Sequence, residues 1–220
     1  MSREYLRSVR CDWKKPGLPP RVGGGRVRDV KHSVEPQYSE RLDHALGFVA
    51  AAFRRQVRKG SGVPYLSHLL QVAATVAEHG GDEEQIVAAL CHDYLEDIEG
   101  AHRDELARRF GDRVARFVEA LSDTTTQPKP PWKQRKVAYL ERLRDEPAEL
   151  KLISAADKLH NASAIVRDRR LVGEAVWERF TPTRDETLWY YREVIVSLSS
   201  DWEHPLLDEL RRVVDEMHQG

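Results

Sequence analysis

The sequence has little cysteine, no long apolar run and almost no net charge. Two cysteines among 220 residues are too few for a disulfide framework, so we expect a reducing compartment. The longest apolar run, residues 46–53, is far too short to cross a bilayer. The first residues also lack the charged-then-apolar order of a signal peptide. We therefore predict a cytoplasmic protein with no membrane partner.

The balance of charges argues against a further class of partner. Lys and Arg number 35 and Asp and Glu 36, for a formal net charge of -1. Without an excess of positive charge, the sequence does not indicate nucleic acid as a partner. A small anionic ligand stays open, because it needs only a local basic patch.

The composition changes near Tyr38. Residues 1–37 contain several prolines, a run of three glycines and scattered basic residues, without a hydrophobic period. This segment is predicted to be a loose basic arm, with docking onto a partner subunit or the rim of the active site as the alternative. Residues 38–220 are long enough for one well-packed domain, which we expect to fold as a unit.

Apolar residues recur every three or four positions from Tyr38 onward, which predicts helices. Ser39 is placed as the cap of the first helix, and Asp82 with Gln85 as a capping box that opens the third. Helices are expected over residues 39–53, 64–79, 82–97, 103–109, 113–122, 133–145, 148–167, 172–180, 184–199 and 204–217. No segment alternates with period two for long enough to predict a sheet. The predicted fold class is all-α, a single domain of about 8–10 helices.

The third predicted helix carries the strongest chemical signal. Its sequence, IVAALCHDYLEDI, places His92, Asp93, Glu96 and Asp97 in an otherwise apolar stretch. Pairing at i and i+4 puts Glu96 beside His92 and Asp97 beside Asp93, so one helix edge holds four ionisable groups. A His-Asp dipeptide alone would indicate a solvated helix face. The added Glu-Asp pair favours a cation or a cleft, because burying three carboxylates uncompensated costs several kcal/mol each.

Two other helices supply candidate ligands. His68 is the only ionisable residue in the first two turns of its helix, where a core histidine is the alternative. Asp157 lies on the apolar face of a later helix, with Asn161 one turn further on. Two histidines and two carboxylates suit Mn²⁺ or Fe²⁺ better than a structural zinc, which favours thiolates. Four such ligands leave room for water and a phosphate oxygen in an octahedral shell.

Three motifs carry a resemblance to a known family. The order of His68, His92-Asp93 and Asp157 resembles the HD superfamily of metal phosphohydrolases. The runs RKGSGVPYLSH (58–68), ALCHDYLED (89–97) and AADKLHN (155–161) are similar to the hydrolase domain of RelA/SpoT-type proteins. That family removes the 3′-pyrophosphate from the alarmones ppGpp and pppGpp with Mn²⁺, and the similarity extends over roughly residues 42–200.

The resemblance implies a role for each matching residue. His68, His92, Asp93 and Asp157 would bind Mn²⁺. Glu96 and Asp97 would orient and deprotonate the attacking water or protonate the leaving oxygen. Asn161 would touch the ribose or a phosphate, and Arg58 and Lys59 would lie against the base and the phosphates. The products would be a nucleoside 5′-di- or triphosphate and pyrophosphate.

Basic and aromatic residues outside these motifs also suit a phosphorylated nucleotide. Basic side chains gather at residues 54–59 and 129–136, where solvated helix ends are the alternative. In the segment that begins at Arg184, the row of aromatics is typical of a core, but Tyr190 is a candidate to line a nucleotide site. We expect Arg184 and Tyr190 to contact substrate.

The chain departs from the family pattern at two positions near the motifs. Phe53 stands where a histidine is common, and Ile98 where threonine is frequent. These departures leave the preference for guanine or adenine open. The oligomeric state also stays open, with a homo-oligomer as one possibility. The chain ends before a synthetase domain could follow, so it resembles a small stand-alone alarmone hydrolase.

Other functions remain as alternatives. Another HD phosphohydrolase would act on a deoxynucleotide or on the 2′-phosphate of NADPH. A catalytically silent HD domain would only bind a nucleotide, but Glu96 and Asp97 argue against it, since a pure binder has little use for two more carboxylates facing an anion.

Overall fold

The computed structural model describes residues 37–124 and 128–219 of the chain. Ten α-helices and one 3-10 segment make up this part, which contains no strand, only an isolated bridge between Val57 and Pro64. The predicted all-α fold is therefore confirmed. The predicted arm falls almost wholly outside the described residues, so its conformation and the division of the chain near Tyr38 stay predictions.

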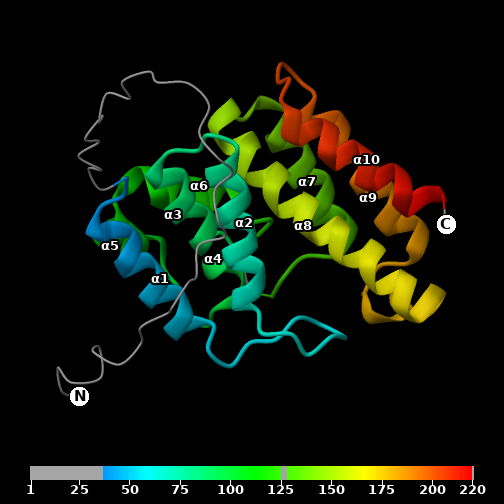
Figure 1. Cartoon of the computed structure of the whole chain (residues 1–220), viewed down its shortest axis with the longest axis horizontal. Helices are drawn as coiled ribbons and strands as arrows, with labels where there is room; N and C mark the ends of the chain where they lie inside the picture. Colours follow the sequence, from blue (N-terminus) through cyan, green and yellow to red (C-terminus); the bar gives the residue numbers. More distant parts are fainter. Residues whose placement is uncertain (1–36, 125–127, 220) are drawn as a thin grey trace, which may run out of the picture. The chain divides into compact units, whose positions relative to one another are not determined.

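Most helices are joined by short connections, whereas a long loop, residues 53–65, links the first helix to the second (Figure 1). The elements in chain order are α1 (Glu40–Ala52), α2 (Leu66–Glu78), α3 (Glu83–Cys91), α4 (Tyr94–Asp97), α5 (Arg103–Phe110), α6 (Asp112–Leu121), α7 (Trp132–Asp145), α8 (Ala148–Val172), the 3-10 segment η2 (Gly173–Arg179), α9 (Arg184–Leu198) and α10 (Pro205–Gln219). None of the described helices combines the length and the apolar character needed to span a bilayer.

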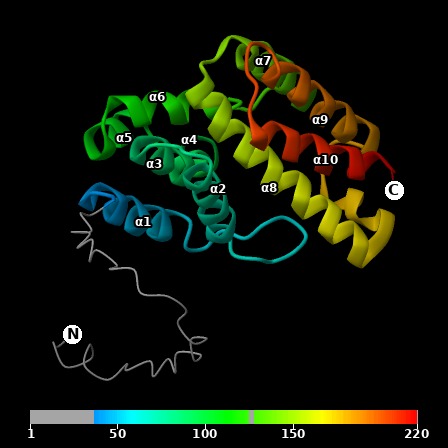
Figure 2. The same ribbon diagram turned by 45° about the horizontal axis from the view of Figure 1, so that its top comes forward.

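Helix α8 lies at the centre of the fold. It packs against α2, α3 and α6 on one side and against α9, α10 and η2 on the other, and Figure 2 shows it running between these two groups. Every residue from Leu150 to Asp157 is buried. A helix that is enclosed all round must be apolar or compensate its polar groups. The burial of Asp157 in this stretch is therefore the feature of the fold that matters most for a site.

The predicted helix starts agree with the structure. The Ser39 side chain accepts a hydrogen bond from the backbone N–H of Arg41, as an N-cap does. Asp82 and Gln85 exchange the two hydrogen bonds of a capping box at the start of α3. The second helix begins at Leu66, two residues after the predicted start at Pro64.

The third predicted helix is wrong in one respect, because it breaks in the middle. Helix α3 ends at Cys91, and α4 begins at Tyr94 after Asp93 leaves the helical conformation with φ -91 and ψ 1. The ring Nδ1 of His92 lies 2.7 Å from the carbonyl oxygen of Ala89, the acceptor that the backbone N–H of Asp93 would use in a continuous helix. No glycine or proline marks this break in the sequence.

Two later boundaries also differ from the prediction. Helix α8 continues to Val172, beyond the expected end at residue 167, and Gly173 ends it with φ +64. Residues 173–179, expected as an α-helix, form the tighter 3-10 segment η2. The longer α8 carries Asp168 and Leu171 past the site motifs, and η2 turns the chain back toward them.

The capping box of α3 leads to a test of local stability. Asp82→Ala removes the side-chain acceptor for the Gln85 N–H, so we expect the free energy of unfolding to fall by about 1 kcal/mol. Urea denaturation followed by circular dichroism measures this change. Asp82→Asn is the matched control, since asparagine also caps helices while both variants lose the charge that pairs with Arg113. Equal losses in the two variants would contradict a role for the cap.

Candidate metal centre and active site

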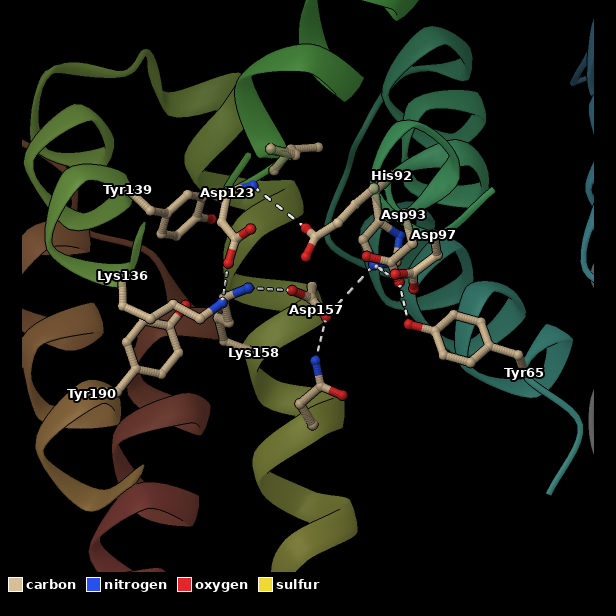
Figure 3. Close-up of a pocket in the computed structure, with 13 residues that line it drawn as sticks. Tyr65, His92, Asp93, Asp97, Asp123, Lys136, Tyr139, Asp157, Lys158 and Tyr190 are labelled. Carbon is tan, nitrogen blue, oxygen red and sulfur yellow. Dashed lines mark hydrogen bonds and ion pairs between the residues drawn. The ribbon is translucent and has the colours of Figure 1, made fainter. Parts of the chain in front are cut away.

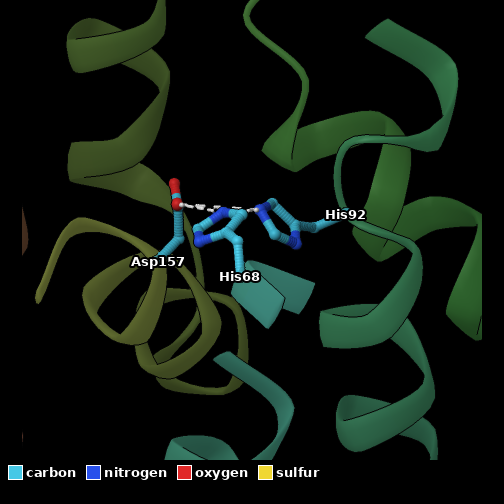
Figure 4. Close-up of side chains that lie close together, drawn as sticks. All are labelled: His68, His92 and Asp157. Atoms are coloured by element: carbon cyan, nitrogen blue, oxygen red, sulfur yellow. Dashed lines mark hydrogen bonds and ion pairs between the residues drawn. The ribbon is translucent and has the colours of Figure 1, made fainter. Parts of the chain in front are cut away.

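The four predicted ligands come together from three separate elements. His68 is on α2, His92 and Asp93 form the junction of α3 and α4, and Asp157 is on α8. The Nε2 atoms of the two histidines lie 3.2 Å apart. Asp157 Oδ1 is 3.3 Å from His68 Nε2, and Asp93 Oδ2 is 3.0 Å from His92 Nε2. Figure 4 shows the two rings and Asp157 pointing toward one common centre.

The outer nitrogen of each ring is held by a hydrogen bond that fixes the direction of the inner one. Because the Ala89 carbonyl can only accept, His92 Nδ1 must carry the proton that it shares with this oxygen. His68 Nδ1 lies 2.7 Å from Nδ1 of His160. Burial, with His68 and Arg58 nearby, lowers the pKa of His160 to about 4, so a neutral His160 accepts from His68. In their neutral forms, both rings therefore direct an Nε2 lone pair toward the common centre.

The charges of this cluster are strongly coupled. Burial disfavours the charged form of His92, but the nearby carboxylates of Asp93 and Asp157 outweigh this effect. They hold the pKa of His92 well above its usual value. The reverse holds for Asp157: burial would raise its pKa, but Lys158 and the two histidines hold it well below the usual range. The two carboxylates thus require positive charge at the centre, and protonated His92 contributes it when no metal is bound.

This donor set fits a divalent cation. His68, His92 and Asp157 each offer a ligand atom, and these atoms all lie within 4.8 Å of one another. Ligands at 2.0–2.2 Å from a metal in neighbouring octahedral positions are about 3 Å apart, which is the spacing of the inner atoms here. Imidazole and carboxylate together suit a metal of intermediate hardness. Metal would displace protons from the histidines, so its affinity should fall as the pH falls.

Neighbouring side chains orient the two carboxylates. Asp157 accepts hydrogen bonds from the side chains of Asn161, at 2.5 Å, and Lys158. Asp93 Oδ2 accepts from the hydroxyl of Tyr65 at 2.7 Å. The Tyr65 ring stacks on Phe53, which is buried, with a centroid distance of 5.4 Å and an angle of 12°. The phenylalanine that departs from the family pattern therefore supports a residue that contacts Asp93.

A cavity opens directly beside the cluster (Figure 3). It is lined by His92, Asp93, Glu96 and Asp97, the four residues that the sequence placed on one helix edge, so their grouping survives the break between α3 and α4. From the other side the lining is Asp123, Lys136, Tyr139, Asp157, Lys158, Asn161 and Tyr190. Carboxylates and lysines thus face each other across the space next to the candidate metal centre.

The surroundings of Glu96 and Asp97 raise the pKa values of both carboxyl groups. Burial raises the pKa of Glu96, and the negative charge of Asp123 adds to this effect against the opposing Lys136 and Lys129. Burial and the charge of Asp93 likewise raise the pKa of Asp97. Carboxyl groups with raised pKa values next to a metal site are typical of general acids and bases.

A second cavity, of about 1100 Å³, continues from the first and shares Tyr65, Glu96, Asp97 and Asn161 with it. Arg58 and Lys59 line it, and the Arg58 guanidinium donates to Asn161 Oδ1 at 2.7 Å. Its volume is slightly above the range of about 300–1,000 Å³ that is usual for small-molecule sites.

One of the predicted substrate residues, Arg184, does not line either cavity. Tyr190 lines the first cavity, whereas the Arg184 side chain lies at the start of α9, where its Nε is 3.5 Å from Glu174. Lys129 and Arg135 of the second basic run lie 3.3 and 3.9 Å from Glu96 Oε1.

Several residues of the site were missed by sequence reasoning. Tyr65, Asp123, Lys158 and His160 contact the candidate ligands or line the first cavity, and none was singled out. Lys158 and His160 lie within the AADKLHN run, which was a usable signal. Asp123 lies just after the end of α6 and far from any motif, and the packing of α6 against α4 brings it to Glu96.

The family assignment follows from a comparison with protein families. A family model described as "HD domain" matches residues 45–182, which is more than half of the chain. The chain belongs to the HD domain family. The match includes all the predicted metal ligands and both predicted catalytic carboxylates, so the resemblance inferred from three short motifs extends over most of the folded chain.

Relatives with assigned names cover parts of this HD domain. A guanosine-3′,5′-bis(diphosphate) 3′-pyrophosphohydrolase of Aquifex aeolicus is 44% identical over 87 residues, 40% of this chain and 12% of the relative. The enzyme MESH1 of Homo sapiens, with the same descriptive name, is 37% identical over 123 residues, 54% of this chain and 66% of the relative. The chain therefore matches only part of the length of each of these relatives.

Solved structures confirm the fold. A metazoan ortholog of SpoT, described as hydrolysing ppGpp, superposes with a TM-score of 0.67 at 25% identity, over 86% of this chain and 99% of the other. The protein lmo0812 from Listeria monocytogenes superposes with a TM-score of 0.64 at 29% identity, over 70% of this chain and 99% of the other.

The geometry of the centre predicts which substitutions abolish metal binding. His92→Ala or Asp157→Ala removes an inner ligand atom, so we expect both variants to lose a bound divalent metal. The melting temperature should fall as well, since metal that binds only the native state stabilises it. Metal analysis and thermal unfolding of the purified proteins measure these changes. His44→Ala, at an exposed position of α1, is the control. Full metal occupancy in both site variants would contradict the ligand assignment.

Proposed function

We propose that this HD protein hydrolyses the 3′-pyrophosphate of guanosine or adenosine alarmones such as ppGpp and pppGpp, with Mn²⁺ bound by His68, His92, Asp93 and Asp157. One observation carries the proposal. The candidate metal centre, the carboxylates of Glu96 and Asp97 and the cavity lined by Arg58 form one continuous site. The names of the Aquifex and human relatives, both 3′-pyrophosphohydrolases, support this substrate class. A cytoplasmic location is part of the proposal.

The residues of the first cavity divide the chemical work. A divalent ion, when bound, would lower the pKa of water and offset charge on the phosphate. Glu96 takes the proton of the attacking water, whose oxygen forms a bond to the phosphorus next to the ribose. Asp97 holds the water in line. The bond from this phosphorus to the 3′-oxygen breaks, and the 3′-oxygen takes the proton that Glu96 accepted from the water, which regenerates the Glu96 carboxylate.

Positive side chains offset the charge that develops in this step. Lys136 and Lys158 line the first cavity opposite Glu96 and Asp97, and both stay charged, because Asp123 and Asp157 lie beside them. Such fixed charges in a confined site stabilise a polyanionic transition state better than water does. The products are the nucleoside 5′-di- or triphosphate and pyrophosphate.

Product analysis tests the proposed function. We expect the Mn²⁺-loaded protein to release pyrophosphate from ppGpp, and Glu96→Gln to keep its metal but to lose about 10²–10⁴-fold in kcat, the usual contribution of a positioned acid or base. Glu99→Gln, at an exposed position three residues away, is the matched control. Chromatography identifies the products. Orthophosphate release from NADPH or from a deoxynucleotide, with ppGpp left intact, would replace the proposal by another phosphatase activity.

The environment of Glu96 predicts a shift of the pH profile. Asp123→Asn removes a negative charge that raises the pKa of Glu96, and it frees Lys136 and Arg135 to lower that pKa further. A general base is active only when deprotonated, so the acidic limb of kcat/KM should move to lower pH. The profile is measured between pH 4 and 9 with Asp145→Asn, at the exposed end of α7, as the control. An unmoved limb would rule out Glu96 as the group that titrates there.

A further inference from the structure

The second cavity reaches well beyond the residues that the proposed function uses. From Asn161 it follows α8 outward to Asp168 and Leu171, and its far wall is Arg179 and Phe180 at the end of η2. Asp157 and Asp168 are both on α8, and eleven residues of helix advance about 16 Å. A nucleoside with a phosphate chain on each of its 3′ and 5′ oxygens spans a distance of this order when extended.

Arg179 is the residue that closes this outer end. Its guanidinium donates to Asp168 Oδ2 at 2.8 Å. Its stem lies against Gly60, where a β-carbon would come within 2.3 Å of the Arg179 Cδ. Gly60 also has φ +75, a conformation that other residues rarely adopt. The loop that carries Arg58 and Lys59 thus passes directly over the Arg179 side chain.

The two ends of the connected cavities carry opposite charge. Around the candidate metal centre, carboxylates outnumber the basic side chains that line the first cavity. The outer end is lined by Arg58, Lys59, Arg167 and Arg179, with Asp168 as its one carboxylate among the described lining residues. Arg167 Nε is 3.7 Å from Asp168, and Arg58 donates to the neutral amide of Asn161. The outer end therefore has an excess of positive charge.

We propose that this outer end is a second phosphate subsite, in which Arg179 binds the 5′-phosphates of a nucleotide whose 3′-pyrophosphate lies at the metal centre. The inference rests on the proposed function and adds a residue that determines specificity. The planar guanidinium of arginine binds phosphate oxygens in pairs. Asp168 holds Arg179 in place and competes with the incoming phosphate. Both side chains are about one-fifth exposed and line the cavity, so an incoming phosphate can reach the pair.

Two substitutions with opposite expected effects test the subsite. Arg179→Met keeps the stem against Gly60 but removes the charge, so KM for ppGpp should rise roughly tenfold. The kcat should change little, because the lost contact is made equally in the bound substrate and in the transition state. Turnover of guanosine 3′-diphosphate, which has no 5′-phosphates, should not change. Asp168→Asn removes the competing carboxylate, so KM for ppGpp should stay the same or fall. Arg170→Met, an exposed arginine of α8 that pairs with Glu216 outside the cavity, is the control.

A purely structural ion pair would give a different pattern. Each variant would then impair both substrates alike, and Asp168→Asn would raise KM for ppGpp as Arg179→Met does. Either result overturns the subsite, as does an unchanged ratio of kcat/KM for the two substrates in Arg179→Met. A raised KM for ppGpp alone, with Asp168→Asn in the other direction or neutral, supports it.

Binding measurements separate failure of the subsite from failure of the proposed function. If the wild-type protein leaves ppGpp intact, the same two nucleotides serve as ligands in calorimetry of the metal-loaded protein. Tighter binding of ppGpp than of guanosine 3′-diphosphate, with the difference lost in Arg179→Met, supports the subsite without any hydrolysis. Equal affinities in the wild-type protein overturn the subsite.

Discussion

Asp157 lies in a stretch of α8 whose residues are buried without interruption, and a carboxylate in that place needs positive charge close by. The fold supplies that charge from two sides. His68 and His92 approach from α2 and the end of α3, and Lys158 pairs with the outer carboxylate oxygen. A divalent cation would satisfy the same requirement better, because both imidazoles and both carboxylates could bind it at once. The packing of α2 and α3 against α8 is thus linked to the occupancy of the centre.

The break between α3 and α4 is part of the same arrangement. If the helix were continuous, the backbone N–H of Asp93 would bond to Ala89, and the His92 ring would lose the acceptor that fixes its Nδ1 proton. The turn also brings Asp93 within reach of the Tyr65 hydroxyl. The non-helical backbone at Asp93 loses one helical hydrogen bond, and this loss is offset by the bonds that orient His92 and Asp93.

Charge also organises the space outside the centre. The cavity next to the metal centre is rich in carboxylates, and the end that faces η2 is rich in arginine. The basic run at residues 129–136 was expected to clamp phosphate. Two of its members, Arg135 and Lys136, instead pair with Asp123 and so set the electrostatic environment of Glu96. In this arrangement Lys136 still lines the cavity, so pairing with Asp123 and contact with a phosphate are compatible.

The sequence by itself determined the helical class, the capping residues and which residues gather at the candidate centre, because each depends on local spacing or on the cost of burying charge within one helix. It did not determine the break at Asp93, the extension of α8 to Val172 or the place of Arg184. The break accompanies a hydrogen bond between the His92 ring and the Ala89 carbonyl, and Arg184 turns toward Glu174; no pattern in the sequence marks either contact. Only the tertiary structure brought Asp123 to Glu96 and Arg179 to Gly60, since these contacts join segments whose local patterns carry no information about each other.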